Sequence, residues 1–475
     1  MKQLSFLLSG WSLLLFFGCV NDSADNPAFG DQDVPSIYVG WQTSMAYKIG
    51  ETIHIEPKVS PSDGATYRWT LDGREIATTK DLSYTLTELL VNAELKFEVA
   101  RNGVSNSRTA TVFVTKDFVP KPNKLKLVGF LTKNGSMDDI DWESITHLVI
   151  SSATVKADGT LELAMPQLNM PALLAIAHHY GVYVLLEVSG AIISINSSCL
   201  YDSWTFYTPA VANPDGLAAN IEKMMKDYGF DGVNIYMDKA STTGSYENPA
   251  AVKTFYEKVA EKIKGSKHTI DGKEYDYLLT LSVVGGWTRE ALAAGTGGSG
   301  ANVTNMPQYD WIHVLAFLDE DIVNVPRSHG TVAYARTEIN NWLNWASLGP
   351  IDNPSRLVLI APAAGIRYYG IPANYTWPTW DDFTQYISYR DICLRYPDAP
   401  TRSPAVIVVI DNYNNRNKEV DKTFYNGLKD MEDRVNQIVI PNNLGGTGLW
   451  SLESDAQDPF LSLLQRLKTT LDKYE

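Results

Sequence analysis

The sequence predicts an α/β protein, a (β/α)8 TIM barrel preceded by a small all-β, immunoglobulin-like sandwich. After about residue 124, eight short apolar runs alternate with amphipathic stretches, as a barrel of parallel strands and helices requires. Before residue 116, the runs alternate every second residue and are separated by turn residues, which is typical of antiparallel strands. A length of 475 residues accommodates one large barrel and one small module.

The N-terminus is predicted to be a lipoprotein signal peptide, residues 1–19. Lys2 supplies the positive start, and the apolar stretch from Phe6 to Phe17 is shorter than the roughly 20 residues that span a bilayer. The segment ending Phe16-Phe17-Gly18-Cys19 resembles the lipobox of bacterial lipoproteins, which implies that Cys19 is lipidated. Simple secretion and an uncleaved start are the alternatives.

Residues 20–35 are polar and are expected to form a flexible tether. Asp22 and Asp25 resemble the acidic signals that send some lipoproteins to the cell surface. We therefore expect a surface lipoprotein of the bacterial outer membrane.

The sandwich is expected over residues 36–116. Its clearest alternating runs are Thr52–Pro57, Thr66–Leu71, Glu94–Val99 and Thr109–Val114. Trp69 stands where immunoglobulin-like and PKD-like modules bury a tryptophan. This region has no cysteine pair, so packing alone must hold the sandwich, which we interpret as a spacer.

The barrel is expected over residues 124–475, after a stiff hinge from Asp117 to Lys124 that contains two prolines. The predicted strands are Leu125–Leu131, His147–Ser151, Val182–Val188, Gly232–Met237, Leu278–Val284, Trp311–Phe317, Leu357–Ala361 and Gly448–Leu452. Intervening helices are predicted at Pro171–His179 and Gly216–Asp227. A further apolar run, Ala405–Ile410, predicts an insertion between the seventh and eighth strands.

The net charge and the cysteine content limit which partners, disulfides and metal sites we expect. A net charge of −15 argues against nucleic acid and against an anionic membrane face, since both require basic patches. Apart from Cys19, only Cys199 and Cys393 remain, and their spacing does not decide whether they pair. No CxxC or His/Cys cluster is present, so we expect no metal and no cofactor.

The fourth predicted strand carries unusual polar residues. Because side chains alternate along a strand, Asn234, Tyr236 and Asp238 are expected to share the barrel interior. Polar side chains inside a barrel are costly unless they hydrogen-bond or line a pocket. Catalytic and binding residues of such barrels lie at the C-terminal ends of the strands, so this segment is the first candidate site.

Here the sequence resembles family 18 of the glycoside hydrolases, which carry Asp-Gly-x-Asp-x-Asp-x-Glu on the fourth strand. The resemblance implies that the final Glu protonates the leaving oxygen and that the preceding Asp orients the 2-acetamido group of the substrate, which acts as the nucleophile. This chain keeps Asp231 and Gly232, and we assign Asp231 a structural role at the base of the strand. It has Asn234 and Tyr236 at the inner Asp positions and Asp238 in place of Glu.

The resemblance covers roughly residues 124–460. It includes Glu187-Val188-Ser189-Gly190 on the third strand, Tyr309–Leu318 on the sixth and Gly445–Ser451 on the eighth. In the family, a Trp on the eighth strand forms the floor of a sugar subsite, which implies this role for Trp450. On the sixth strand, Phe317 replaces a Tyr whose hydroxyl is expected near the acetamido group.

These departures predict weakened or lost hydrolysis. Asp238 is the one catalytic candidate, and its shorter side chain draws the carboxyl back by roughly 1 Å, a misplacement that can cost about a hundredfold in rate. Tyr236 cannot supply the anionic partner of the acetamide.

The predicted ligand-binding residues are Asn234, Tyr236, Asp238, Glu187, Trp287, Phe317 and Trp450. Core packing for the Trp residues, and an internal network for Asn234, Asp238 and Glu187, are the structural alternatives.

The leading hypothesis is a surface lipoprotein whose non-catalytic barrel binds glycans with N-acetylglucosamine, of N-glycan or chitin type, for partner glycan-uptake proteins. The main alternative is an active endo-β-N-acetylglucosaminidase or chitinase with Asp238 as acid. Another glycosidase, using a pair such as Glu187 and Asp319, falls in the same class. A third interpretation is a structural or protein-binding module, and assays of binding and turnover separate all three.

Overall fold

The computed structural model describes residues 34–40, 44–122, 124–165, 168–195, 198–237, 248–284, 306–317, 330–344, 353–372, 384–410 and 419–474. The chain divides into two compact units, with the boundary between Val114 and Thr115. Each unit has a hydrophobic core of its own.

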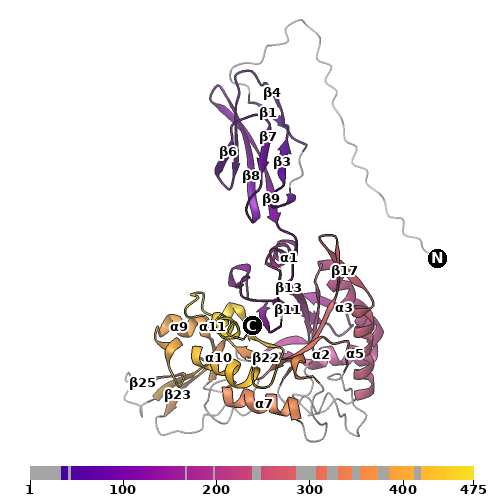
Figure 1. Cartoon of the computed structure of the whole chain (residues 1–475), viewed down its shortest axis with the longest axis vertical. Coiled ribbons are helices and arrows are strands. Elements are labelled where there is room, and N and C mark those ends of the chain that lie inside the picture. The colour runs from indigo at the N-terminus through magenta and orange to yellow at the C-terminus, as the bar shows by residue number, and fades with distance from the viewer. Residues whose placement is uncertain are drawn as a thin grey trace, which may run out of the picture. The chain divides into compact units, whose positions relative to one another are not determined.

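The first unit is an all-β module (Figure 1). Its strands are β1 (Ser36–Tyr38), β2 (Ser44–Lys48), β3 (Thr52–Ile55), β4 (Lys58–Ser60), β5 (Thr66–Leu71), β6 (Arg74–Ala77), β7 (Leu82–Thr85), β8 (Leu90–Arg101) and β9 (Val104–Thr115). One sheet has the order β2-β9-β8-β5-β6, while β3 pairs with β7 and β1 with β4. Trp69 is fully buried and stacks on Phe97 with ring centroids 4.3 Å apart, so the predicted core tryptophan is confirmed.

The second unit contains a closed barrel of eight parallel strands, as predicted. They are β10 (Lys126–Thr132), β11 (His147–Val155), β13 (Tyr183–Ser189), β16 (Gly232–Tyr236), β19 (Leu278–Val284), β20 (Trp311–Leu315), β22 (Leu357–Pro362) and β27 (Gly446–Trp450). Strand β27 pairs with both β22 and β10, which closes the cylinder. Gly446 has φ +144°, and a Cβ there would lie 2.1 Å from the carbonyl oxygen of Lys126, so only glycine fits this closure.

The barrel is surrounded by α1 (Met170–His179), α2 (Ser203–Ala212), α3 (Pro214–Tyr228), α5 (Pro249–Lys264), α7 (Val332–Asn344), α10 (Leu428–Arg434) and α11 (Leu463–Leu471). Helices α1, α3 and α5 each follow an asparagine cap and carry a proline in the first turn. A π-helical turn, η6 (Val435–Val439), continues α10. Smaller elements are the antiparallel strand β12 (Leu161–Leu163) and the hairpins β14 (Ala191–Ile195) with β15 (Ser198–Asp202) and β17 (Lys267–Ile270) with β18 (Lys273–Asp276). Single turns occur at η1 (Met137–Asp139), η4 (Pro354–Arg356) and η7 (Leu452–Ser454).

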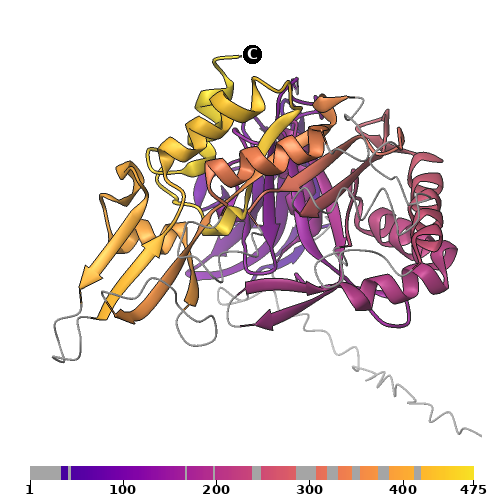
Figure 2. The same cartoon turned by 90° about the horizontal axis from the view of Figure 1, so that it is seen from below.

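The insertion between β22 and β27 forms a four-stranded antiparallel sheet in the order β24-β23-β26-β25. It contains β23 (Ala364–Pro372), β24 (Thr384–Ser388), α9 (Tyr389–Arg395), η5 (Ala399–Thr401), β25 (Val406–Ile410) and β26 (Glu419–Phe424). The apolar run at Ala405–Ile410 therefore lies in the insertion, as predicted. This sheet lies on the side of the barrel opposite α3 and α5, as Figures 1 and 2 both show.

The segment predicted as a hinge is bonded to the barrel. Phe118 is 1% exposed and packs against the rings of His178, Tyr183 and Tyr275 at centroid distances of 4.8 to 5.2 Å. The ammonium of Lys121 donates to three backbone carbonyls, those of Trp142, Glu143 and Ile145. Burial lowers the pKa of Lys121 to about 8. Residues 118–121 are thus part of the barrel unit.

Two features concern the cell envelope and redox chemistry. Within the described ranges, no helix is both long and apolar enough to cross a membrane. Cys393 is buried and free, and burial raises the pKa of its thiol to about 11.

Candidate functional site

Strand β16 presents its residues as alternation predicts. Val233 and Ile235 belong to the core between strands and helices, whereas Tyr236 belongs to the apolar cluster inside the barrel. Asn234 also points inward, where it contacts strands β13, β19 and β20. Asp231 lies at the strand base, fully buried, and accepts hydrogen bonds from the Val184 N–H and from His178 Nε2, a structural role.

A closed polar layer crosses the barrel at the level of Asn234. Its amide nitrogen donates to Glu187 Oε2 at 2.6 Å and to Ser282 Oγ at 2.8 Å. Its amide oxygen accepts from Thr280 Oγ1 at 2.7 Å and from His313 Nδ1 at 3.1 Å. All four hydrogen-bonding positions of the amide are therefore used inside the barrel.

The tautomer of His313 follows from this geometry. The indole N–H of Trp311 can only donate, and it lies 2.7 Å from His313 Nε2. Nε2 is therefore the acceptor, and the ring proton lies on Nδ1, which donates to Asn234. Burial lowers the pKa of His313 to about 3, so the ring is neutral.

Glu187 is the acidic member of the layer and is fully buried. One carboxyl oxygen bonds the Ser151 hydroxyl, and the other accepts from Asn234 and Ser282. Burial raises the pKa of Glu187 to about 7, which outweighs the lowering effect of its hydrogen bonds. The family resemblance implies Asp at position 234. This chain instead has an amide there and its carboxyl opposite it, at Glu187 on the neighbouring strand β13.

An aromatic cluster lies at the C-terminal ends of the strands. The Trp450 ring is partly exposed, with its centroid 4.7 Å from Phe130, 6.3 Å from Phe317 and 6.5 Å from Tyr236. Tyr236 and Phe317 are only 2% and 4% exposed. The structure thus brings together three of the predicted ligand-binding residues, and among these three Trp450 offers the most accessible ring.

Several predicted residues lie outside the described residues. They are the catalytic candidate Asp238, the predicted ligand-binding residue Trp287, the alternative acid Asp319 and the lipidation site Cys19. Their roles stay predictions.

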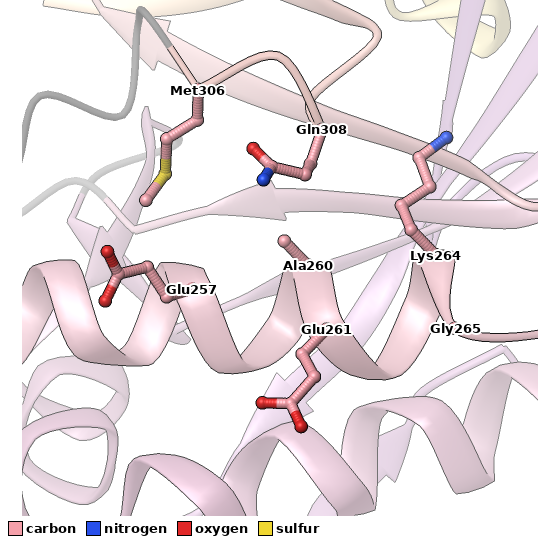
Figure 3. Close-up of a pocket in the computed structure, with 7 residues that line it drawn as sticks. All are labelled: Glu257, Ala260, Glu261, Lys264, Gly265, Met306 and Gln308. Atoms are coloured by element: carbon pink, nitrogen blue, oxygen red, sulfur yellow. The ribbon is translucent and has the colours of Figure 1, made fainter.

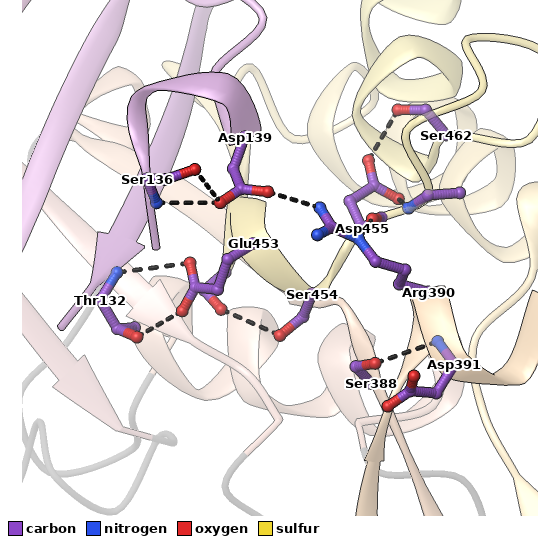
Figure 4. A network of polar contacts seen from close by, with 12 residues as sticks. Thr132, Ser136, Asp139, Ser388, Arg390, Asp391, Glu453, Ser454, Asp455 and Ser462 are labelled. Carbon is purple, nitrogen blue, oxygen red and sulfur yellow. Dashed lines mark hydrogen bonds and ion pairs between the residues drawn. The ribbon is translucent and has the colours of Figure 1, made fainter. Parts of the chain in front are cut away.

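A polar network that the sequence did not predict, called the polar rim below, joins the segments after β10 and β27 to α9 of the insertion (Figure 4). The Glu453 carboxylate, in η7 just after Trp450, accepts from the hydroxyl and the N–H of Thr132 at the end of β10. Arg390, from α9 of the insertion, donates to Asp139 at 2.8 Å and to the Asp455 carbonyl oxygen at 2.8 Å. Ser136 and Asp139 form a Ser-x-x-Asp cap, the one local signal that the sequence offers for this rim.

One hollow, of about 370 Å³, is lined by residues that include Asp139, Arg390 and Asp455 of the polar rim. Another, of about 340 Å³, is lined by residues of α5 and by Met306 and Gln308, on the outer surface of the barrel (Figure 3). Among the residues whose structure is described, no group of three or more His, Cys, Asp or Glu side chains is placed to hold a metal ion.

Comparison with known proteins agrees with this architecture. The family model of Glycosyl hydrolases family 18 matches residues 126–455, and that of the PKD-like domain matches residues 38–100. No curated protein matches the chain.

Similar solved structures belong to chitinases and a chitinase relative. The GH18 chitinase ChiB from the chitin utilization locus of Flavobacterium johnsoniae is 16% identical, with a TM-score of 0.51 over 74% of this chain and 96% of that chain. Ostrinia furnacalis Group IV chitinase is 17% identical, with a TM-score of 0.53 over 73% and 100%. Human YKL-39, a pseudo-chitinase with retained chitooligosaccharide binding properties, is 15% identical, with a TM-score of 0.54 over 73% and 100%. At these identities the likeness shows the fold alone.

Proposed function

The chain belongs to glycosyl hydrolases family 18, and from this premise we propose that its barrel binds N-acetylglucosamine-containing glycans without hydrolysing them. The observation that carries the proposal is the state of strand β16. Both of its inner positions that family enzymes fill with Asp hold other residues, and both are buried. Asn234 is saturated within the polar layer, and Tyr236 packs among aromatic rings.

Glu187 does not replace the missing acid. A general acid must come within hydrogen-bond reach of the leaving oxygen. Both oxygens of Glu187 are instead engaged inside the barrel, and the side chain is fully buried. Its raised pKa therefore reflects burial in the layer and gives no support to the Glu187–Asp319 alternative.

Trp450 is the proposed contact with sugar. A partly exposed indole ring suits the C–H face of a pyranose, and Phe130 and Phe317 pack against this ring. Human YKL-39 is a pseudo-chitinase that retains chitooligosaccharide binding, so binding without turnover occurs elsewhere on this fold.

The proposed place of action is the bacterial cell surface. A chain lipidated at Cys19 and tethered by residues 20–35 would hold the barrel outside the outer membrane. Captured chains of N-glycan or chitin type would then pass to partner glycan-uptake proteins. Radiolabelled palmitate incorporation that is lost in Cys19→Ala supports the anchor, and unchanged labelling of that variant contradicts it.

Binding and turnover assays test the proposal. Chitohexaose and N-glycans should bind the purified protein in calorimetry and should release no new reducing ends. Trp450→Ala should weaken binding at least tenfold, because it removes the ring face. Trp142→Ala is the control, since Trp142 lies beside Lys121 and away from Trp450, and its affinity should be unchanged.

Two results would overturn the proposal. Steady product release that Asp238→Asn abolishes would establish the hydrolase alternative. Absence of both binding and turnover would favour a structural or protein-binding module.

A further inference from the structure

A buried arginine lies behind the aromatic cluster. Arg434, the last residue of α10, is fully buried, and one of its terminal nitrogens donates to the Gly330 carbonyl oxygen. A second contact, to Asn426 Oδ1, is long at 3.5 Å. Nε and Nη1 have no hydrogen-bond partner among the described residues. Most of the N–H donors of the guanidinium are therefore buried without a hydrogen-bond partner in the part of the chain that the structure describes.

This arrangement destabilises the folded state. A buried charge loses its hydration, and an incomplete set of hydrogen bonds does not offset the lost hydration free energy. Burial lowers the pKa of Arg434 to about 10, so the side chain is still charged at neutral pH. The negative charge of Asp430 opposes this lowering. An apolar side chain of similar length would fill the space at lower cost. The stability of α10 therefore does not explain Arg434.

Its acceptor, Gly330, lies directly against the aromatic cluster. Gly330 has φ +61°, and a Cβ there would come within 2.5 Å of Phe317 Cβ and 2.7 Å of Phe317 Cα. The backbone at Gly330 thus packs on Phe317, whose ring centroid lies 6.3 Å from that of Trp450. A continuous chain of contacts runs from Arg434 through Gly330 and Phe317 to Trp450.

We propose that Arg434 is a positioning residue for the glycan-binding face, holding Gly330 against Phe317 so that Phe317 fixes the Trp450 ring. The inference rests on the proposed function only in taking Trp450 as the binding face. Arg434 itself touches no ligand. Its charge matters because the guanidinium reaches the Gly330 carbonyl from across the fold, which no apolar side chain can do.

Fluorine NMR of the full chain labelled with 5-fluorotryptophan tests the proposal. The chain has 12 Trp residues, and the Trp450 resonance is assigned by its loss in Trp450→Phe. Arg434→Met and Gly330→Ala should both shift this resonance, because each displaces the Phe317 ring. In a Phe317→Ala background, Arg434→Met should cause no further shift, since the coupling runs through that ring. Arg434→Lys, which cannot bridge to Gly330 in the same way, replaces Arg434→Met if the latter fails to fold.

Arg336→Met is the matched control. Arg336 is an exposed arginine that joins α7 to Gln437, so its loss removes a nearby contact without affecting Gly330. Its Trp450 resonance should not move. Arg434→Met and Gly330→Ala should weaken chitohexaose binding by up to about tenfold, the range expected from one aromatic packing contact. The melting temperature of Arg434→Met should be unchanged or higher.

An unmoved Trp450 resonance in both variants would overturn the inference. So would a lower melting temperature of Arg434→Met with unaltered resonance and affinity, which would mean a purely structural role. If the wild-type chain binds no oligosaccharide, the proposed function fails, and the fluorine resonance still decides whether Arg434 positions Trp450.

Discussion

At the scale of single residues, Glu187 links the polar layer to pH. Its pKa in the folded chain is about 7, above the ordinary value of 4.5. The folded state therefore holds a proton that the unfolded state releases, and this stabilising contribution is complete below pH 4.5 and lost as pH rises to about 7.

Glu187→Gln should remove this pH dependence. The oxygen of the Gln amide can accept from Asn234, and its nitrogen can donate to the hydroxyl oxygen of Ser151, so the contacts of the layer are kept. Relative to the wild type, the variant should gain ~3 kcal/mol of unfolding free energy between pH 4.5 and pH 7 and no more above that. Urea unfolding of both proteins across this range measures the difference. The buried histidines contribute to both proteins alike, so parallel profiles would contradict the assignment.

The sequence predicted part of this site. Strand alternation correctly placed Asn234 and Tyr236 inside the barrel, because that parity depends only on local geometry. The partners of Asn234 on β19 and β20 could not be predicted, since they lie 46 and 79 residues away along the chain. For the same reason, the sequence left open whether Glu187 faces a ligand or an internal network.

At the scale of elements, Phe118 should contribute strongly to barrel stability. Phe118→Ala should lower the unfolding free energy of the barrel by about 3–5 kcal/mol, because it leaves a cavity between His178, Tyr183 and Tyr275. Calorimetry of the full chain measures the change. Val119→Ala is the control, since Val119 is 67% exposed and should change stability by no more than about 0.5 kcal/mol. Equal effects of the two variants would mean that the segment does not pack as described.

The barrel strands were predictable because parallel strands are covered on both faces and form short continuous apolar runs. The packing of residues 118–121 could not be predicted. The prolines of the predicted hinge indicated a stiff linker, and no local pattern shows that Lys121 reaches three carbonyls in the turn before β11. The sequence therefore did not show that this segment packs on the barrel.

At the scale of the whole molecule, the two units should unfold separately, since each has its own core. Trp69→Ala should destabilise the sandwich alone by about 3–5 kcal/mol, because Trp69 is fully buried against Phe97. Differential scanning calorimetry should show one transition shifted to lower temperature and the barrel transition unchanged. Tyr38→Ala, at a side chain that is 64% exposed, should shift neither. A common shift of both transitions would contradict independent folding.

The closed polar layer determines which substitutions the barrel can tolerate during evolution. Each hydrogen bond of Asn234 ends on a side chain of the same layer, and none requires a group from the rim above. Substitution of the partly exposed Trp450 therefore leaves every hydrogen bond of the layer in place, whereas Tyr236 and Phe317 are buried and their loss would lower stability. The proposed contact with sugar can thus change at Trp450 while the barrel beneath it keeps its hydrogen bonds.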